Sequence, residues 1–487
     1  MDSKMKVAVV GGGIAGLSAA YYLDKQARAV GHDAKIILLE SANYWGGKIK
    51  TVVEDGFVVE GGPDAYLVSK PWMRALACEV GLENDLQGTN PNFSATFILH
   101  NGILTPLPAK LTMTIPTEIS PIFKTKLLTW PQKMRMGLDL FLPANKQKGD
   151  ESLAEFISRR LGRAAYERLV GPLLSGIYAG DGNRLSLQST FPNLRQMELE
   201  HGSLIKGALS LRVNRVTKAG HLAKNGNYNG SLRQASIFES PRSGLTSIVN
   251  RIVARLEETG VDLRLKTSVG KVVVSKSGCI LTLTTSEEIR VDAVVLATPA
   301  YVAGDLMKDA LPNLADELNS IEYVSTATVS LAYLKDELPT NLEGYGYIVP
   351  QQEGSKALAC TWTSSKWRHR APDNRVLLRV FIGRIQDVNT LPTDKDLLIS
   401  MAREELRYSM GIKTQPIAAW AFYWEKAMPQ YNLGHPERLE RIERLLMEHP
   451  NLVLAGNGYR GIGIPDCVHS GMEAAEKIVE FLKRTKE

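Results

Sequence analysis

Apolar and polar positions alternate in blocks at the start of the chain. An apolar run from Val7 to Val10 leads into three glycines and an amphipathic stretch from Leu17 to Arg28, and a second apolar run from Lys35 to Leu39 ends at Glu40. Short apolar runs bounded by glycine are typical of buried parallel strands, whereas a period of three to four residues is typical of a helix. The pattern therefore predicts strand, tight turn, helix, strand and then a carboxylate.

The middle of the chain has a helical pattern. The segment from Leu107 to Ala144 is apolar with interspersed Lys and Pro, and the segment from Ser152 to Leu174 predicts helices. Glu155 follows Ser152 by three residues, which matches a capping box at a helix start. The stretch from Leu204 to Leu232 is basic and rich in Gly and Asn, so we expect an exposed loop there.

Strand patterns flank this middle region on both sides. A strand pair is expected early in the chain, a helix is expected from Leu245 to Leu256, and the last sixty residues contain one more apolar run before a glycine turn and a final helix. The predicted strands are Thr51–Val53, Phe57–Val59, Val261–Leu265, Val269–Val274, Ile280–Thr284 and Val291–Thr298, the last of them ended by Pro299. We therefore predict an α/β (α+β) fold in which a Rossmann-like nucleotide-binding domain is discontinuous in sequence.

Size and composition fit a multidomain enzyme. The 487 residues are 44% hydrophobic and 23% charged, which is close to the average for globular proteins and excludes a disordered chain. The four cysteines have no paired spacing, so we expect reduced thiols and no metal site. No apolar run is long enough to span a bilayer, and we expect a cytoplasmic protein.

The charge balance is mildly basic. The net charge is +6, from 58 Lys and Arg against 52 Asp and Glu, which favours an anionic ligand. No block of basic residues is long enough to indicate nucleic-acid binding, so we exclude that role. The segment from Ile122 to Pro143 mixes Trp130 and other apolar residues with lysines, and it suggests a weak peripheral contact with the inner face of the membrane as a second possibility beside a helix pair facing the core.

The first glycine turn has the spacing of a dinucleotide site. Gly11 allows the turn, Gly13 lets the backbone approach a pyrophosphate, and Gly16 lets the helix pack against the strand. A diphosphate then lies at a helix N-terminus, where amide groups and the helix dipole favour an anion. Glu40 would accept hydrogen bonds from the ribose hydroxyls, and a carboxylate there argues against a ribose 2′-phosphate.

Further glycines recur near both ends of the chain. Gly46-Gly47-Lys48 and Gly61-Gly62 follow the first nucleotide-binding elements, and such pairs mark places where the backbone runs beside something bulky or turns with positive φ. Near the C-terminus, Gly456, Gly458, Gly461 and Gly463 precede a helix whose start would point into the nucleotide fold. Such a helix start would stabilise negative charge on a bound cofactor.

These motifs together resemble the flavin-containing amine oxidase and protoporphyrinogen oxidase superfamily. Within it, four segments look like the Bacillus-type porphyrinogen oxidases that form coproporphyrin: Glu60-Gly61-Gly62-Pro63-Asp64, Leu173-Leu174-Ser175-Gly176-Ile177-Tyr178-Ala179-Gly180-Asp181, Met428-Pro429-Gln430-Tyr431 and Gly463-Ile464-Pro465-Asp466. The second segment is the most specific, because it is unrelated to dinucleotide binding. Without the resemblance, it would be a helix end capped at Gly176 with Tyr178 packed inward.

The resemblance implies FAD as cofactor and assigns residues to it. The implied FAD contacts are Gly11, Gly12, Gly13, Ile14, Ala15, Gly16, Glu40, Ser41, Lys48, Gly62, Pro63, Asp64, Ala65, Val269, Trp424, Ile462, Gly463 and Ile464. The implied substrate contacts are Lys70, Ile177 and Tyr178. No catalytic side chain is assigned, because removal of hydride by a flavin requires orientation more than an acid or base.

Two positions depart from the patterns of the wider superfamily. Tyr44 stands where the cofactor segment usually has an arginine, and Thr96 stands where animal and plant protoporphyrinogen oxidases have an arginine before a Phe-Leu pair. Lys70 would supply the positive charge for substrate propionates instead, as in the Bacillus-type enzymes. As an isolated residue, Lys70 could equally be a solvated surface lysine.

The resemblance further implies an oxidase of haem biosynthesis that removes six electrons from coproporphyrinogen III with molecular oxygen as acceptor, giving coproporphyrin III and hydrogen peroxide. Its partners would be the porphyrinogen, oxygen and neighbouring enzymes of the haem pathway. It also implies an FAD-binding domain (1–70, 233–300 and 421–487), a mixed-sheet substrate domain (71–106, 185–232 and 301–420) and a helical insertion (107–184). Three alternatives stay open: a protoporphyrinogen IX oxidase, a flavin amine oxidase or desaturase, and a non-enzymatic relative like the Rab-binding GDP-dissociation inhibitors.

Overall fold

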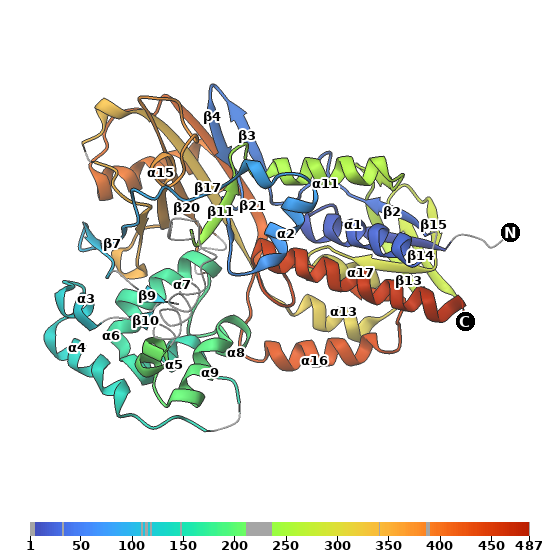
Figure 1. Ribbon diagram of the computed structural model, residues 1–487, viewed down its shortest axis with the longest axis horizontal. Coiled ribbons are helices and arrows are strands. Elements are labelled where there is room, and N and C mark those ends of the chain that lie inside the picture. The colour runs from blue at the N-terminus through green and yellow to red at the C-terminus, as the bar shows by residue number, and fades with distance from the viewer. Residues whose placement is uncertain are drawn as a thin grey trace, which may run out of the picture. The chain divides into compact units, whose positions relative to one another are not determined.

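The computed structural model describes residues 5–31, 34–108, 111–112, 115–116, 119–146, 149–210, 236–339, 341–385 and 390–486. Two compact units are formed, each from separated stretches of chain (Figure 1). The first unit comprises Met1–Gly88, Ile237–Glu322 and His435–Glu487, and the second comprises Thr89–Ser236 and Tyr323–Gly434. The finer division into three domains stays a prediction.

The first unit is built on a five-stranded parallel sheet with the order β12-β2-β1-β16-β22. Its strands and covering helices are β1 (Lys6–Val10), α1 (Ile14–Ala29), β2 (Lys35–Leu39), α11 (Thr246–Glu258), β12 (Asp262–Arg264), β16 (Ala293–Leu296), β22 (Leu452–Leu454) and α17 (Ile464–Lys486). The predicted order of strand, turn, helix and strand at the N-terminus is confirmed. Continuous burial of β1 and β2 beyond their first residues explains why they appear in the sequence as unbroken apolar runs.

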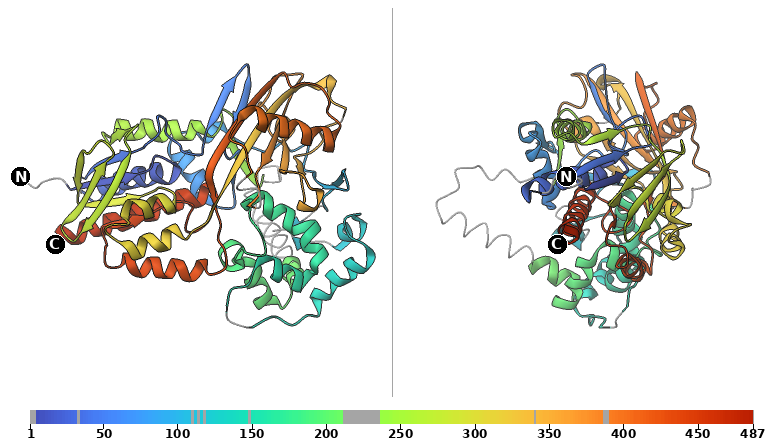
Figure 2. Two further views of the ribbon diagram at one scale, coloured as in Figure 1. Left: turned by 180° about the vertical axis from the view of Figure 1, so that it is seen from behind. Right: turned by 90° about the vertical axis from the view of Figure 1, so that its right-hand side faces the viewer.

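Helices α1 and α17 come from opposite ends of the chain and lie side by side (Figures 1 and 2). Gly471 is the reason for their close approach, since a Cβ there would stand 2.3 Å from the carbonyl oxygen of Ala15. Leu17 and Leu23 of α1 and Ile478 of α17 are fully buried in the same core. The two chain ends therefore fold together, as the two glycine regions of the sequence require.

Smaller elements complete the first unit. They are β3 (Thr51–Glu54), β4 (Phe57–Glu60), β5 (Tyr66–Leu67), α2 (Pro71–Glu79), η1 (Glu83–Asp85), β6 (Leu86–Gly88), β11 (Phe238–Pro241), β13 (Val269–Ser275), β14 (Gly278–Leu283), β15 (Glu288–Val291), α12 (Ala300–Met307), α13 (Pro312–Asn319) and α16 (His435–Leu446). Strands β3 and β4 form a hairpin, β5-β11-β6 form a small sheet, and β13-β14-β15 form an antiparallel sheet.

One sequence prediction in this unit is wrong. The apolar run from Val291 to Thr298 does not form a single strand, because β15 ends at Val291 and β16 begins at Ala293 in a different sheet. The break is at Asp292, whose carboxylate accepts a hydrogen bond from the backbone amide of Lys6 at 2.6 Å. A long-range contact therefore divides a segment that looks uniform in the sequence.

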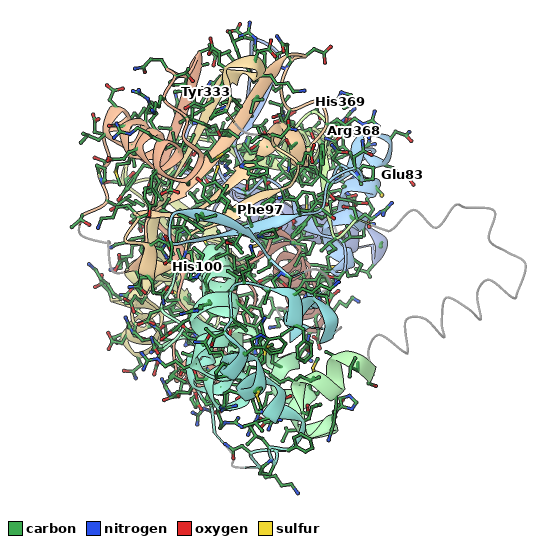
Figure 3. The ribbon with its side chains drawn as sticks, turned by 90° about the vertical axis from the view of Figure 1, so that its left-hand side faces the viewer. Glu83, Phe97, His100, Tyr333, Arg368 and His369 are labelled. Carbon is green, nitrogen blue, oxygen red and sulfur yellow. The ribbon has the colours of Figure 1, made fainter. Side chains whose placement is uncertain are left out.

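The second unit is built on a seven-stranded mixed sheet with the order β21-β17-β20-β19-β18-β7-β8. These strands and the elements between them are β7 (Thr96–His100), β8 (Ile103–Pro106), β17 (Tyr323–Leu334), η4 (Lys335–Glu337), β18 (Gly346–Ile348), η5 (Gln351–Glu353), β19 (Ala357–Trp362), α14 (Thr363–Lys366), β20 (Arg375–Ile382), α15 (Lys395–Met410) and β21 (Ala418–Pro429). Residues of α15 share a buried core with the sheet. Figure 3 shows Phe97 and His100 on the strand β7 and Tyr333 on β17.

The remainder of the second unit is mainly helical and has its own hydrophobic core. Its elements are β9 (Leu111–Thr112), β10 (Ile115–Pro116), α3 (Ile119–Lys124), α4 (Trp130–Gly137), η2 (Leu138–Leu140), α5 (Leu153–Leu161), α6 (Arg163–Ala165), η3 (Tyr166–Val170), α7 (Gly171–Tyr178), α8 (Leu187–Thr190) and α9 (Pro192–His201). The capping box predicted at Ser152 and Glu155 is present at the start of α5. The loop predicted from Leu204 is wrong for residues 204–210, which are helical, and the rest of that stretch lies outside the described residues.

Candidate functional site: a dinucleotide cradle in the first unit

The turn between β1 and α1 has a different steric environment at each of its glycines. Gly11 has φ +106°, and a Cβ there would stand 2.7 Å from the carbonyl oxygen of Ala297. A Cβ at Gly16 would stand only 1.8 Å from the carbonyl oxygen of Gly11. At Gly13, in contrast, a Cβ would have no described heavy atom beyond its chain neighbours within 4 Å. Gly11 and Gly16 are therefore required by the fold, whereas Gly13 leaves space open above the turn.

The start of helix α1 borders this open space. Gly13 is its N-cap residue, and no side chain in the described chain caps this end of the helix. Its first turn also contains no acidic residue that would neutralise the positive end of the helix dipole. An uncapped helix start beside open space fits a diphosphate, which would accept hydrogen bonds from the amide groups there.

Glu40 is held at the end of the neighbouring strand β2. One carboxylate oxygen accepts from the amide of Gly12 at 2.6 Å, and the other accepts from the amide of Ala42 at 2.7 Å and from the Ser41 hydroxyl at 3.2 Å. These bonds fix the orientation of the carboxylate, and the oxygen that accepts from Gly12 has a further lone pair for a ribose hydroxyl. The backbone around Glu40 also pairs with the segment before Val269, since the carbonyl of Glu40 accepts from the amide of Thr267 at 2.8 Å.

The segment Gly46-Gly47-Lys48 lies against the first glycine turn, which runs from Gly11 to Gly16. Gly46 donates from its amide to the carbonyl of Gly12 at 2.8 Å and forms a bridge with Gly13. Lys48 follows, and in the described part of the chain no acceptor pairs with its ammonium group. Burial lowers the pKa of this ammonium, with the nearby Cys467 thiol as a smaller opposing influence. A partly buried cation without a partner in the described chain fits a cofactor that carries negative charge.

The Gly61-Gly62 segment packs directly behind Lys48. A Cβ at Gly62 would stand 1.8 Å from the carbonyl oxygen of Lys48, so only glycine fits there. The following residues Pro63, Asp64 and Ala65 are half-buried in the first unit. Tyr44, which stands where an arginine is usual, is partly exposed, and the Lys50 ammonium lies 5.1 Å from the centre of its ring.

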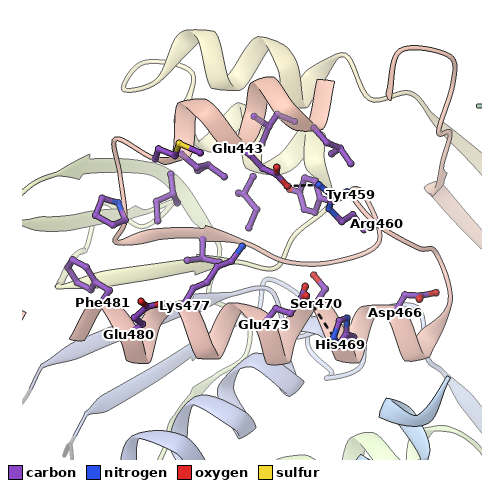
Figure 4. Close-up of a pocket in the computed structure, with 18 of the residues that line it drawn as sticks. Glu443, Tyr459, Arg460, Asp466, His469, Ser470, Glu473, Lys477, Glu480 and Phe481 are labelled. Carbon is purple, nitrogen blue, oxygen red and sulfur yellow. Dashed lines mark hydrogen bonds and ion pairs between the residues drawn. The ribbon is translucent and has the colours of Figure 1, made fainter. Parts of the chain in front are cut away.

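The C-terminal glycine turn lies at the same edge of the sheet as the first turn. Strands β2, β1, β16 and β22 are parallel neighbours, so their carboxyl ends meet at one edge, where parallel sheets place their ligands. Positive φ at Gly456 and Gly461 shapes the turn that follows β22. Figure 4 shows this turn between α16 and α17, with Tyr459 and Arg460 on it and Asp466 and Ser470 on α17. The cradle is therefore formed by three separate segments of the chain.

Three predicted FAD contacts lie at the end of this turn, and one lies elsewhere. Ile462 and Gly463 end the turn, and Ile464 begins helix α17. Asp466 accepts from the amide of Gly463 at 3.2 Å. Trp424 belongs to the second unit, where it lies on β21 opposite Thr326 of β17.

The predicted substrate residues are placed in both units. Lys70 is in the first unit, and its ammonium group donates to both carboxylate oxygens of Asp466 at 2.6 and 2.7 Å. Tyr178 ends helix α7 in the second unit and is buried, with its ring edge-on to Phe191 at 6.0 Å and to Tyr431 at 6.3 Å. Its neighbour Ile177 is 46% exposed. The helix continues through Gly176, and Ala179 forms its left-handed cap at φ +52°.

Several supporting residues were not identified from the sequence. Trp45 fills the space beside Gly12, where a Cβ would stand 2.4 Å from its ring. Two more support the C-terminal glycine turn: Asp466 accepts a hydrogen bond from the amide of Gly463, and the His435 ring bonds to the carbonyl of Tyr459. Asp466 is three residues beyond Gly463, which is the spacing of a helix N-terminal cap and could have identified it. No local signal identifies His435, because its partner is distant in sequence.

Two classes of feature are absent from the described chain. Within the ranges given above, no group of His, Cys, Asp and Glu side chains is arranged to hold a metal ion. In those same ranges, none of the helices combines the length and apolar character needed to span a bilayer.

Comparison with known proteins extends these observations. The model of the family described as flavin containing amine oxidoreductase matches residues 14–479. The coproporphyrinogen III oxidases of Bacillus subtilis and Staphylococcus aureus are 34% and 33% identical to this chain, over 99% and 98% of it and 99% of their own lengths. A crystal structure described as a protoporphyrinogen oxidase from Exiguobacterium sp. 255-15 is 32% identical and superposes with a TM-score of 0.83, over 99% of this chain and all of the other.

Proposed function

Because the chain belongs to the flavin-containing amine oxidoreductase family, we propose that it is an FAD-dependent oxidase that converts coproporphyrinogen III to coproporphyrin III. The observation that carries the proposal is the open space over Gly13, bordered by an uncapped helix start and by the oriented carboxylate of Glu40. Full-length similarity to coproporphyrinogen III oxidases supports the choice of substrate.

The chain's own residues would divide the work of holding FAD. The amides at the start of α1 would bind the diphosphate, and Glu40 would bind the adenosine ribose. Lys48 and the start of α17 would face the part of the flavin that gains negative charge on reduction. The remaining predicted contacts from Gly62 to Ala65, at Val269 and at Trp424 would shape the walls around the cofactor.

A porphyrinogen has four pyrroles joined by saturated carbon bridges, and forming the porphyrin removes six hydrogens. Bound FAD would supply a two-electron acceptor that is used three times, so three molecules of oxygen would give three of hydrogen peroxide. The protein's role in each round is to orient a bridge carbon, admit oxygen and exclude competing reactions. We assign Lys70, Ile177 and Tyr178 to substrate contact, with Lys70 reaching a propionate from its position on Asp466.

The direct test is oxygen consumption by the purified protein with each reduced porphyrinogen. Coproporphyrinogen III should be oxidised more efficiently than protoporphyrinogen IX, with porphyrin fluorescence and peroxide appearing together. The opposite ranking would favour the protoporphyrinogen IX oxidase, and peroxide release with polyamines alone would favour an amine oxidase. A colourless protein that binds no FAD would favour a non-enzymatic binding protein.

A peripheral membrane contact has a specific surface to support it. Helix α4 and its neighbours expose several large apolar side chains, namely Phe123 (49%), Trp130 (62%), Met134 (72%), Leu138 (49%) and Phe141 (82%). The Lys133 ammonium lies 5.1 Å from the centre of the Trp130 ring and donates to the carbonyl of Phe123 at 2.7 Å. Apolar and cationic groups on one surface favour an anionic lipid interface.

Sedimentation with anionic vesicles at low and high salt tests this contact. We expect salt-sensitive binding that a Trp130→Ser and Phe141→Ser double variant loses while keeping porphyrinogen oxidation. Equal sedimentation of the wild type with and without vesicles would refute it. The contact with neighbouring haem-pathway enzymes stays a prediction.

A further inference from the structure

The C-terminal glycine turn, from Gly456 to Gly463, is held from outside by side chains of helices α16 and α17. On the α17 side, Ser470 accepts from the amide of Gly456 at 3.0 Å, and Asp466 accepts from the amide of Gly463 at 3.2 Å. These two bonds fix the ends of the turn. Its middle has to be fixed by something else, since six residues lie between them.

The middle of the turn is held by His435, the first residue of α16. Its Nε2 lies 2.9 Å from the carbonyl oxygen of Tyr459, and the residue is fully buried. A carbonyl can only accept, so Nε2 must carry the proton in this bond. Burial, with Arg438 and Arg460 as smaller causes, lowers the pKa of the imidazole to about 4 despite this bond, so the ring is a neutral donor at neutral pH.

A second contact to the middle of the turn is weak. Arg460 pairs with Glu443 of α16, as Figure 4 shows, but both side chains are more than half exposed. Exposed ion pairs hold a backbone poorly, because water competes for both partners. The buried bond from His435 is therefore the stronger of the two.

We propose that His435 is a positioning residue for the flavin, because it fixes the Tyr459 carbonyl and so the turn that presents Ile462, Gly463 and the start of α17 to the cofactor. The inference rests on the proposed function. Loss of this bond would let the turn shift away from the cofactor. The amide groups of the turn and of the start of α17 would then stabilise the flavin less than in the wild type, and the loss would be larger for the reduced, anionic flavin than for the neutral oxidised one. The midpoint potential would become more negative.

The test compares three variants of the full-length protein loaded with FAD. His435→Leu removes the donor, whereas His435→Gln places an amide nitrogen near the position of Nε2 and can restore the bond. His449→Leu is the matched control, because this histidine lies beyond the other end of α16 and, in the described chain, its ring makes no hydrogen bond. The readouts are the flavin midpoint potential and the dissociation constant of FAD from the apoprotein.

We expect His435→Leu to bind FAD about tenfold more weakly, as a buried carbonyl without a donor predicts, and to have a more negative potential at saturating FAD. His435→Gln and His449→Leu should stay close to wild type in both the dissociation constant of FAD and the midpoint potential. An unchanged potential in His435→Leu, or an equal shift in His435→Gln, would overturn this inference alone. A wild-type protein that binds no FAD would instead overturn the proposed function.

Discussion

Replacing the glycines of the first turn one at a time separates their roles in folding and in binding. Gly13 has φ −70° and ψ 175°, which alanine adopts easily, and its added Cβ would enter open space. Gly13→Ala should therefore change the stability of the apoprotein by less than about 1 kcal/mol, since the gain from restricting the unfolded chain is offset by alanine's poorer fit at the N-cap of α1. Gly16→Ala should instead destabilise it by about 1–3 kcal/mol or more, because its Cβ would overlap the carbonyl of Gly11.

Gly13→Ala should weaken FAD binding, although it should hardly change the stability of the apoprotein. The new methyl group would occupy the space expected for the diphosphate and displace it from the amides of α1. Loss of one hydrogen bond to a charged group costs about 1.5–3 kcal/mol, which corresponds to a roughly 10- to 100-fold rise in the dissociation constant of FAD.

The assay combines urea unfolding of the apoprotein with FAD titration followed by flavin fluorescence. Gly137→Ala is the matched control, because Gly137 also has a permitted φ of −64° and open space for a Cβ but lies in the helical part of the second unit. If Gly13→Ala binds FAD as tightly as wild type, the space above the turn does not hold the diphosphate. If it is destabilised as much as Gly16→Ala, the steric argument itself is wrong.

Two further predictions follow from charged and titratable groups of the first unit. Asp466→Asn should raise the flavin midpoint potential, because it removes a negative charge and leaves Lys70 without its carboxylate. Lys70→Met should lower the potential, because it removes the positive charge. Potentiometry measures both shifts, and shifts of the same sign in the two variants would contradict this prediction. The pKa of His435 is lowered from its ordinary value of 6.5 to about 4, so below pH 6.5 the unfolded chain binds a proton that the folded chain does not. Stability should therefore be complete above pH 6.5 and fall towards pH 4, by up to about 3 kcal/mol for a shift of this size. His435→Gln should flatten that part of a pH series of urea unfolding curves, and identical curves for both proteins would refute the assignment.

Local patterns predicted much of the fold because local physics decides those parts. The apolar run at Lys35–Leu39 matches β2 in full, since a strand buried on both faces leaves no polar interruption. The cap at Ser152 was predictable because both of its partners lie within one helical turn. The roles of Gly11 and Gly16 likewise depend on neighbours in the same strand–turn–helix unit, apart from the Ala297 contact.

The predictions failed where a distant residue decides the structure. The run through Asp292 is divided by a contact with Lys6, which lies 286 positions away. The alternative interpretation of the segment around Gly176, as a helix end capped at that glycine, is also wrong, because Ala179 takes the left-handed position at the end of α7. In the candidate site, His435 and the ion pair of Lys70 with Asp466 connect residues that have no pattern in common. Such supporting contacts depend on tertiary packing, so a single sequence does not specify them.

The most direct test of the central claim is an anaerobic one. The purified protein, loaded with FAD, is mixed with coproporphyrinogen III in the absence of oxygen, and the visible absorption of the flavin is recorded before and after air is admitted. The account predicts that the absorption is lost on mixing and returns with oxygen, while porphyrin fluorescence increases. A flavin spectrum that does not change on mixing, or a protein that holds no flavin, would contradict it.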